Sequence, residues 1–426
     1  QGLSLRQTFL LTTAVWLALP LFGALPFVIG DNGGIGPTPE VAFVDAFFEA
    51  MSGLTTTGAT VFEDLEQMPH GILLWRSLLQ WLGGIGIIVV AMVFLPELRV
   101  GGMQIFRSEA FDTMGKILPR AAEIAARIFW IYVVLTAFAF FGFLAVGMTA
   151  FDAICHAFTA ISTGGFSTSD DSFTIHQGAP EDFATVIMLL SSLPFVRYIQ
   201  LLAGTARPFL HDPQIRAYFA VIGIVVLALS LFQVVEDGRG LEPSFREALF
   251  NVTSIISGTG YASVDYQLWG PFPVVVFFFL GLIGGCAGST ACSVKIFRYQ
   301  LLFAAVRAQI RSIHAPHGVF TPRYNGRPVT EDILTSVMAF FGMFIVSLGV
   351  LAVALGMTGL DTVTAVSGAA TALANIGPGL GDKIGPAGNF QGLNDTAKWL
   401  LTVAILVGRL EILSVYVLFT LRFWRD

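Results

Sequence analysis

The sequence has 426 residues, of which 55% are hydrophobic and 12% are charged, and its formal net charge is −6. Soluble domains carry about 25% charged residues, so this composition excludes an ordinary soluble domain and indicates a protein of the lipid bilayer. The chain also lacks the strongly basic balance of a nucleic-acid binder, so we expect membrane lipid around it and no nucleic-acid partner.

Eight apolar runs are long enough to cross a membrane as helices, since one span takes roughly 20 residues. The first run is too long for the core of a signal peptide and has no clear cleavage site, so we expect a retained spanning helix. In chain order the runs are 6–29, 72–95, 125–147, 183–202, 215–235, 273–302, 333–356 and 399–421.

Four shorter apolar segments lie between the members of successive pairs of runs. They are 42–54, 151–161, 245–256 and 361–373. Each is too short for a full crossing, so they are interpreted as half-helices that enter the membrane and turn back.

A glycine-centred loop follows each short segment, at Gly58, Gly165, Gly260 and Gly377. Counting back from each glycine, alanine stands twelve residues earlier, serine or threonine six earlier, and leucine or isoleucine four earlier. One spacing written four times indicates an internal repeat. We therefore predict an all-α integral membrane protein with four pseudo-repeats of helix, pore helix, filter loop and helix around one central pore.

The predicted repeats divide the whole chain. They cover 1–100, 101–210, 211–325 and 326–426, with filter loops at 55–60, 162–167, 257–262 and 375–379. Most of the 23 Lys and Arg residues lie at the termini and in the connections between repeats, 96–125, 203–216 and 295–331. By the positive-inside rule these faces are cytoplasmic, so the filter loops are expected to face the outside. That opposite face is acidic, which concentrates cations.

The glycine loops suit a cation filter. Non-helical backbone at membrane depth must be buried in protein or line a watery cavity, and rings of carbonyl oxygens can replace the water around a dehydrated ion. The loops contain no carboxylate, which argues against a divalent-cation filter. The predicted ion-binding residues are Thr56, Thr57, Gly58, Ser162, Thr163, Gly164, Gly165, Gly258, Thr259, Gly260, Asn375, Ile376 and Gly377. Small residues at ordinary helix contacts are the alternative, but they do not explain four copies in register.

A gate is predicted in the sixth run, where glycines and hydroxyl residues interrupt the apolar sequence. Each glycine disfavours the helix by nearly 1 kcal/mol relative to alanine, and no comparable polar interruption occurs in the other second helices. The residues are Gly284, Gly285, Gly288, Ser289 and Thr290. A movable loop beneath the filter is one interpretation, and a helical packing face is the other.

Arg409 lies well inside the last apolar run. An arginine at that depth is costly unless it meets water or a partner, and Glu411, two residues on, points to a different helical face. We expect Arg409 to face the conduction path below the filter, with carbonyls or hydroxyls of the glycine-rich loop as partners. Snorkelling to the cytoplasmic interface is the alternative. Arg197 is a similar intramembrane charge, to which no role is assigned.

The loops TTTGAT, STGGFST, SGTGYAS and NIGPG, in that order, resemble the Trk/Ktr/HKT superfamily of potassium transporters. Further similar motifs are WLGGIGIIV at 81–89, LRVGGMQIFRSE at 98–109 and GRLEIL at 408–413. The basic connection after the second helix is most similar to the pore-forming Trk subunit. The resemblance covers essentially the whole chain. Trk subunits carry a further pair of helices upstream, so it implies either that such a pair precedes Gln1 or that the chain is built like the shorter Ktr type.

The resemblance implies a potassium-conducting subunit in the cytoplasmic (inner) membrane, with potassium at the filter and no covalent cofactor. Glycine at position 58 is the pattern that the family associates with potassium selectivity, and the segment 284–293 matches its intramembrane gate. It also implies a homodimer attached to a cytosolic nucleotide-binding regulatory subunit of the TrkA type. The coupling ion, sodium tolerance and regulatory nucleotide are not implied.

Three other functions are compared with the sequence features. A Ktr-type potassium/sodium-coupled transporter has the same motifs, whereas a secondary transporter for a larger solute shows two inverted halves instead of four repeats. A membrane enzyme needs paired polar groups. His156 and His176 are interpreted as scattered singles, and His314 and His317 lack a carboxylate motif. The three cysteines are interpreted as small buried residues.

Overall fold

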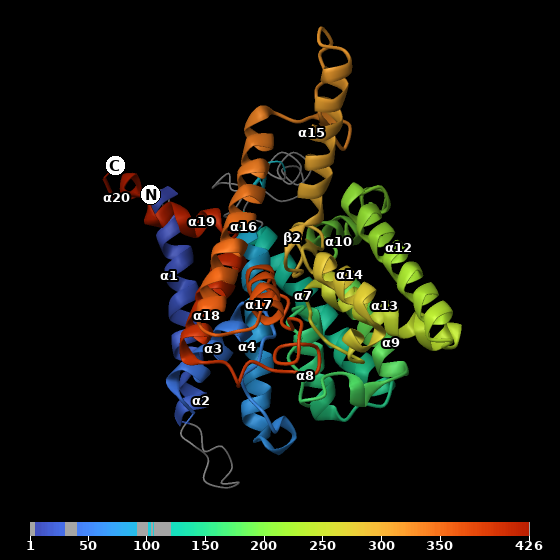
Figure 1. Ribbon diagram of the computed structural model, residues 1–426, viewed down its shortest axis with the longest axis vertical. Helices are drawn as coiled ribbons and strands as arrows, with labels where there is room; N and C mark the ends of the chain where they lie inside the picture. Colours follow the sequence, from blue (N-terminus) through green and yellow to red (C-terminus); the bar gives the residue numbers. More distant parts are fainter. Residues whose placement is uncertain (1–4, 30–40, 92–100, 104, 106–120, 426) are drawn as a thin grey trace.

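The computed structural model describes the chain except residues 1–4, 30–40, 92–100, 104, 106–120 and 426 (Figure 1). The described part is helical, as expected, apart from two short strand pairs: β1 (Ile283–Gly284) with β2 (Val294–Lys295), and β3 (Arg323–Tyr324) with β4 (Arg327–Pro328). Most of the basic connection 96–125 and of the motif at 98–109 lies outside the described residues.

Four long apolar helices begin the four predicted units. They are α1 (Leu5–Gly23) with its continuation α2 (Leu25–Ile29), α7 (Ala121–Ala145), α12 (Pro213–Glu236) and α16 (Glu331–Met357). Large apolar side chains stand exposed on their outer faces, such as Val134, Ile224 and Val350. Exposed apolar surface of this extent is that of helices facing lipid.

Four short helices match the expected half-helices. They are α3 (Phe43–Leu54), α8 (Ala150–Ile161), α13 (Leu241–Ser257) and α17 (Thr362–Ala374). Side-chain caps fix where two of them begin, because Thr149 accepts from the Asp152 N–H and Asp361 accepts from the Thr364 N–H. Helix α13 begins four residues before its expected start, since Pro243 in its first turn is compatible with a helix.

The helices that follow the four glycine loops, called the second helices, differ from one another. Helix α4 (His70–Val89) is continuous, whereas α14 (Pro271–Gly281) ends before the β1–β2 segment and the chain resumes helix at α15 (Ile296–His314). Helix α9 (Ala179–Ser191) meets α10 (Phe195–Leu202) at 87°, and α18 (Asp395–Arg409) meets α19 (Leu413–Tyr416) and η5 (Val417–Phe419) at 104°.

The described residues hold five single helices able to span a membrane, or seven if each bent pair counts as one span. Only the sixth of the eight apolar runs was expected to be interrupted. The runs 183–202 and 399–421 are also broken, so that expectation was wrong for these two. Pro194 has no N–H to continue α9, and the freed carbonyls of Ser191 and Ser192 accept from the N–H groups of Thr290 and Cys286. At the other break, Glu411 and Ile412 adopt left-handed φ of 62° and 48°.

The packing of the helices follows one rule around the molecule. Each half-helix contacts the long helix before it, as in α1 with α3 and α7 with α8, and the second helix after it. Each second helix also contacts the half-helix of the following unit, in the pairs α4–α8, α9–α13, α14–α17 and α18–α3. The last of these pairs closes the ring of contacts.

Short elements join these units. They are η1 (Leu65–Gln67), η3 (Thr174–His176), α11 (Arg207–Leu210), η4 (Tyr266–Trp269) and α20 (Leu421–Arg425). Helix α15 projects beyond the other helices at the top of Figure 1, so this basic helix is the most protruding described part of the chain.

Candidate functional site

The four half-helices end in the same backbone turn. The residue two positions before each loop glycine has a left-handed φ: 52° at Thr56 and Thr163, 75° at Gly258 and 53° at Asn375. The next N–H donates to the carbonyl five residues back, a Schellman-type ending. These bonds are Thr57 to Ser52 (2.8 Å), Gly164 to Thr159 (2.8 Å), Thr259 to Ser254 (2.9 Å) and Ile376 to Thr371 (3.1 Å).

The loop glycines face one another's carbonyls in cyclic order. Their φ values are +82°, +80°, +82° and +107° in chain order, a region that side chains rarely adopt. A Cβ at Gly58 would lie 2.2 Å from the Gly164 oxygen, and the remaining contacts are Gly165 with Thr259 (1.8 Å), Gly260 with Ile376 (2.0 Å) and Gly377 with Thr57 (2.8 Å). The loops therefore lie together, each against the next, with no room for a side chain at these glycines.

Side-chain bonds tie neighbouring loops together in the same cyclic order. The contacts run from Gln80 to Gly164, from Thr159 to Tyr261, from Gln267 to Gly381 and from Asn375 to Thr57. Asn375 donates through Nδ2 both to Thr57 Oγ1 (2.9 Å) and to the Ile405 carbonyl (2.8 Å). Within the described part of the chain, no group donates a hydrogen bond to the carbonyls of Thr57, Thr259 or Ile376. Such carbonyls are available to a cation.

Gln80 of α4 makes two hydrogen bonds to the second loop. Its Nε2 donates to the Gly164 carbonyl (2.6 Å), its Oε1 accepts from the Phe166 N–H (3.1 Å), and its side chain is fully buried. Of the four carbonyls that face the loop glycines, which form the carbonyl ring, only that of Gly164 has a protein donor among the described residues.

We expect Gln80→Leu to lower the free energy of unfolding by about 1–3 kcal/mol, because it leaves the buried Phe166 N–H without a partner. The measurement is unfolding of the purified protein in detergent. Gln309→Leu on the exposed face of α15 is the matched control and should change little. Equal stability of the two variants would contradict this assignment.

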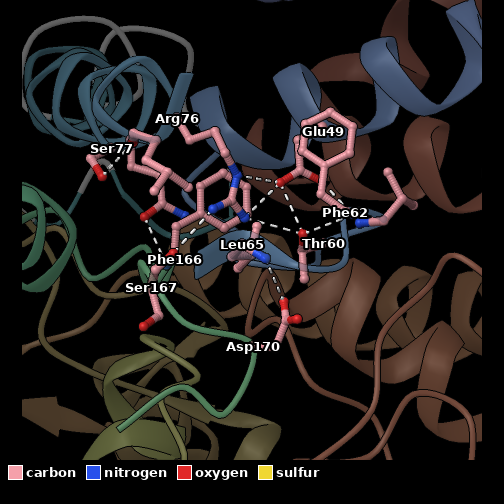
Figure 2. A network of polar contacts seen from close by, with 12 residues as sticks. Glu49, Thr60, Phe62, Leu65, Arg76, Ser77, Phe166, Ser167 and Asp170 are labelled. Atoms are coloured by element: carbon pink, nitrogen blue, oxygen red, sulfur yellow. Dashed lines mark hydrogen bonds and ion pairs between the residues drawn. The ribbon is translucent and has the colours of Figure 1, made fainter. Parts of the chain in front are cut away.

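A buried ion pair braces the first and second loops (Figure 2). Arg76 of α4 pairs with Glu49 of α3 at 2.8 Å, and the two side chains are 1% and 0% exposed. Glu49 also accepts from the Val61 N–H (2.9 Å) and the Thr60 hydroxyl (3.0 Å). On its other side Arg76 donates to the Ser167 carbonyl (3.1 Å).

The guanidinium of Arg76 also lies 4.3 Å from the centroid of the Phe166 ring, so its charge is enclosed by a carboxylate, a carbonyl and an aromatic face. This pair was not predicted from the sequence. The available signal was the carboxylate of Glu49 near the middle of an apolar half-helix and a lone arginine in an apolar span, since intramembrane charges of opposite sign tend to pair.

The predicted gate residues lie in the segment between α14 and α15. Thr290 donates through its hydroxyl to the Ser191 carbonyl (2.9 Å), Ser289 donates to the Cys286 carbonyl (2.7 Å), and Gly288 accepts from the Phe195 N–H (2.9 Å). A Cβ at Gly284 would lie 2.0 Å from the Cys292 oxygen. The segment is therefore non-helical and is held against the break between α9 and α10.

Cys292 lies where this segment meets the half-helix ends. Its N–H donates to the Ser257 carbonyl at the end of α13 (3.1 Å), and its Sγ is 3.6 Å from Thr56 Oγ1 of the first loop. The following residue, Ser293, donates to Ala374 at the end of α17 (2.8 Å). The segment between α14 and α15 thus contacts the ends of three half-helices, and the interpretation of Cys292 as only a small buried residue missed this position.

Arg409, 5% exposed, is the last residue of α18 and not a mid-helix residue as expected. Its Nη1 donates to Cys292 Sγ (2.8 Å), so the partner is the thiol and not a carbonyl or hydroxyl of the segment. Among the described residues nothing bonds its Nε or Nη2. Glu411 pairs instead with Arg298, as the poor geometry toward Arg409 predicts.

A small cavity lies at this point, lined by Asn375, Cys292, Lys295, Arg409 and Glu411 among others. The structure therefore brings Arg409 and the segment between α14 and α15 close to the predicted ion-binding loops. Arg197 stands apart from them: it pairs with Asp212 at 2.6 Å and donates to Gln200 at 3.0 Å, which accounts for its charge structurally.

Two carboxylates cross-link the loops that follow the first and second glycines. Asp170 accepts from the Asp64 N–H (2.7 Å) and the Leu65 N–H (3.3 Å), and Glu66 accepts from the Ser169 hydroxyl and the Asp170 N–H. Partial burial raises the pKa of Asp170. Burial acts in the same direction on Glu66, but the hydrogen bonds from Ser169 and Asp170 outweigh it and lower the pKa of Glu66.

Comparison with known proteins gives a consistent result. The family model described as "TrkH: Cation transport protein" matches residues 1–425. The Trk system potassium uptake protein TrkI of Halomonas elongata is 44% identical over 422 residues, which cover 99% of this chain and 84% of that protein. The Trk system potassium uptake protein TrkH of Vibrio parahaemolyticus is 38% identical over 431 residues, which cover 99% and 86%.

A solved structure is also similar. The crystal structure of the potassium transporter TrkH from Vibrio parahaemolyticus matches with a TM-score of 0.89 and 35% sequence identity, covering 100% of this chain and 87% of that one. These relatives are named as transporters or as components of a transport system, in agreement with the expectation of a transporter and not an enzyme.

Proposed function

Because the chain belongs to the TrkH family of cation transport proteins, we propose that it selects potassium with the backbone carbonyls of its four glycine loops. At the coarser level it is a membrane subunit of a Trk-type potassium uptake system. The observation that carries the proposal is the cyclic contact of Gly58, Gly165, Gly260 and Gly377 with the carbonyl oxygens of the neighbouring loops.

The chemistry follows from this ring. A potassium ion loses water on entry, and carbonyl oxygens without other donors compensate for that loss. The half-helices end at the ring, so the negative ends of their dipoles add to its attraction for a cation. The ion-binding oxygens come from the loops, and no carboxylate is needed for a monovalent ion that must also leave.

The gate is the second part of the proposal. The segment 284–293 obstructs the path below the ring, and Arg409 places a positive charge there. The unpartnered Nε and Nη2 atoms within the described residues support this role, since a purely structural arginine would use its donors. Opening then requires the segment to leave its contacts with Ser191, Ser257 and Ala374.

The location and partners are proposed on the same basis. We expect a cytoplasmic-membrane protein with its filter loops facing outside, working as a homodimer with a cytosolic nucleotide-binding subunit. The exposed arginines of α15, Arg307 and Arg311, support a cytosolic docking role for this protruding helix. Potassium is the transported ion and no covalent cofactor is proposed.

The direct test is rubidium or potassium flux into liposomes that contain the purified chain, with sodium as competitor. In this assay Gly58→Ser is expected to weaken discrimination against sodium. Its Cβ would approach the Gly164 oxygen to 2.2 Å from a left-handed backbone, so the ring has to deform. Gly223→Ser is the matched control, because a Cβ at Gly223 meets nothing within 4 Å. An unchanged preference for potassium in Gly58→Ser would refute the filter assignment.

A further inference from the structure

A separate group of side chains that could bind a metal lies next to the second loop. Asp152, His156 and His176 each offer one ligand atom, and these atoms all lie within 4.8 Å of one another. The ring centroids of His156 and His176 are 5.2 Å apart, and the two ring planes are nearly perpendicular. The prediction that the two histidines are scattered singles was wrong, because η3 lies against α8 and brings His176 to His156.

The nitrogens and oxygens of this group are only partly engaged by protein. Nε2 of His176 is buried and has no hydrogen-bond partner among the described residues. His156 is fully buried, with Nδ1 2.8 Å from the Asp152 carbonyl and Nε2 3.3 Å from Ser167 Oγ. A buried imidazole nitrogen without a partner is unfavourable, which points to a ligand that is not protein.

The donor set identifies the ligand by its chemistry. Two imidazoles and one carboxylate are typical zinc ligands, whereas calcium and magnesium prefer oxygen throughout. Ligand atoms around a tetrahedral zinc ion lie about 3.3 Å apart, so each side chain has to move inward by less than about 1 Å. His176 can make that adjustment because its neighbours Thr174, Ile175 and Gln177 are exposed. Asp152 is held by the hydroxyls of Thr149 and Thr168, each at 2.7 Å, as ligating carboxylates often are.

We propose that Asp152, His156 and His176 form a zinc-binding site, with Ser167 Oγ or water at the fourth position. The three ligands come from the half-helix α8 and from η3, and Ser167 follows the glycine of the second loop by two residues. A bound ion joins these elements and stiffens the support of that loop. Zinc binding itself does not depend on the proposed potassium pathway, so the failure of one does not remove the other.

The experiment titrates the metal-free, full-length purified chain in detergent with zinc chloride alone, followed by calorimetry. One equivalent is expected to bind, and His176→Gln is expected to weaken the affinity at least about tenfold, since even indirect partners of a metal contribute that much. His70→Gln, an exposed histidine in α4, is the control for surface binding and should leave the affinity unchanged.

Cobalt(II) provides a second readout, because its visible absorption reports tetrahedral coordination and does not require transport. The tetrahedral spectrum is expected in the wild type and in His70→Gln and is expected to be lost in His176→Gln. No stoichiometric zinc binding by the wild type, or binding that survives His176→Gln unchanged, would overturn the assignment.

Discussion

Arg409→Ala is expected to raise potassium flux. The guanidinium lies 2.8 Å from Cys292 Sγ, which in turn is 3.6 Å from the hydroxyl of Thr56 in the first loop. A unit charge about 8 Å from the ion opposes it by roughly 2 kcal/mol at an effective dielectric constant near 20. Removing that charge lowers the barrier accordingly, which is a rate increase of about thirtyfold.

The controls separate charge from packing. Arg409→Lys keeps the positive charge and should retain low flux, whereas Cys292→Ser leaves Arg409 in place and removes only the sulfur contact. Shortening the segment between Gly284 and Ser289 should also raise flux, since it withdraws the obstruction itself. Rubidium uptake into liposomes measures all four variants. A fall in flux for Arg409→Ala, at normal membrane expression, would remove the gate from the proposal.

The positions of the four half-helices and of the loops that follow them could be predicted because they depend on local sequence. Ala, Ser or Thr, and Leu or Ile recur at fixed distances before each glycine, and each half-helix then ends in the same Schellman-type turn. The left-handed residue two positions before the glycine was not predicted. It is Thr, Thr, Gly and Asn in the four copies, so no single residue type marks it.

The bends of the second helices could not be read from apolar length. Pro194 is a visible break signal. The carbonyls at this break also accept hydrogen bonds from the N–H groups of Cys286 and Thr290, which lie far along the chain and give no local signal. The break after Arg409 contains no proline or glycine. Within this break Glu411 pairs with Arg298, a residue of another element, and apolar length carries no signal of such a contact.

The same limit applies to the polar groups around the loops. Glu49 and Arg76 are 27 positions apart, and Cys292 and Arg409 are 117 apart, so each pair is defined only by the fold. Sequence reasoning reached Arg409 from the cost of its charge in an apolar run. The contact of Arg409 with the Cys292 thiol was not predicted, because a single thiol in an apolar segment is compatible with ordinary burial.

Arg76→Met is expected to lower the free energy of unfolding by about 3–5 kcal/mol, because it leaves the Glu49 carboxylate buried without its counter-charge. The double variant Glu49→Gln/Arg76→Met should be more stable than Arg76→Met alone. Glutamine keeps an acceptor for the Val61 N–H and carries no charge, so only the desolvated carboxylate distinguishes the two proteins. Unfolding of the purified chains in detergent measures the difference.

Arg246→Met is the matched control, because its partners Glu242 and Asp182 are well exposed and such surface pairs contribute about 0–1 kcal/mol. If Arg76→Met destabilised the protein no more than this control, the buried pair would not brace the loops. If the double variant were less stable than Arg76→Met, lost packing would explain the effect. The predicted order instead shows that the charges of Glu49 and Arg76 are coupled across the first and second loops, because removing the stranded carboxylate relieves part of the destabilisation.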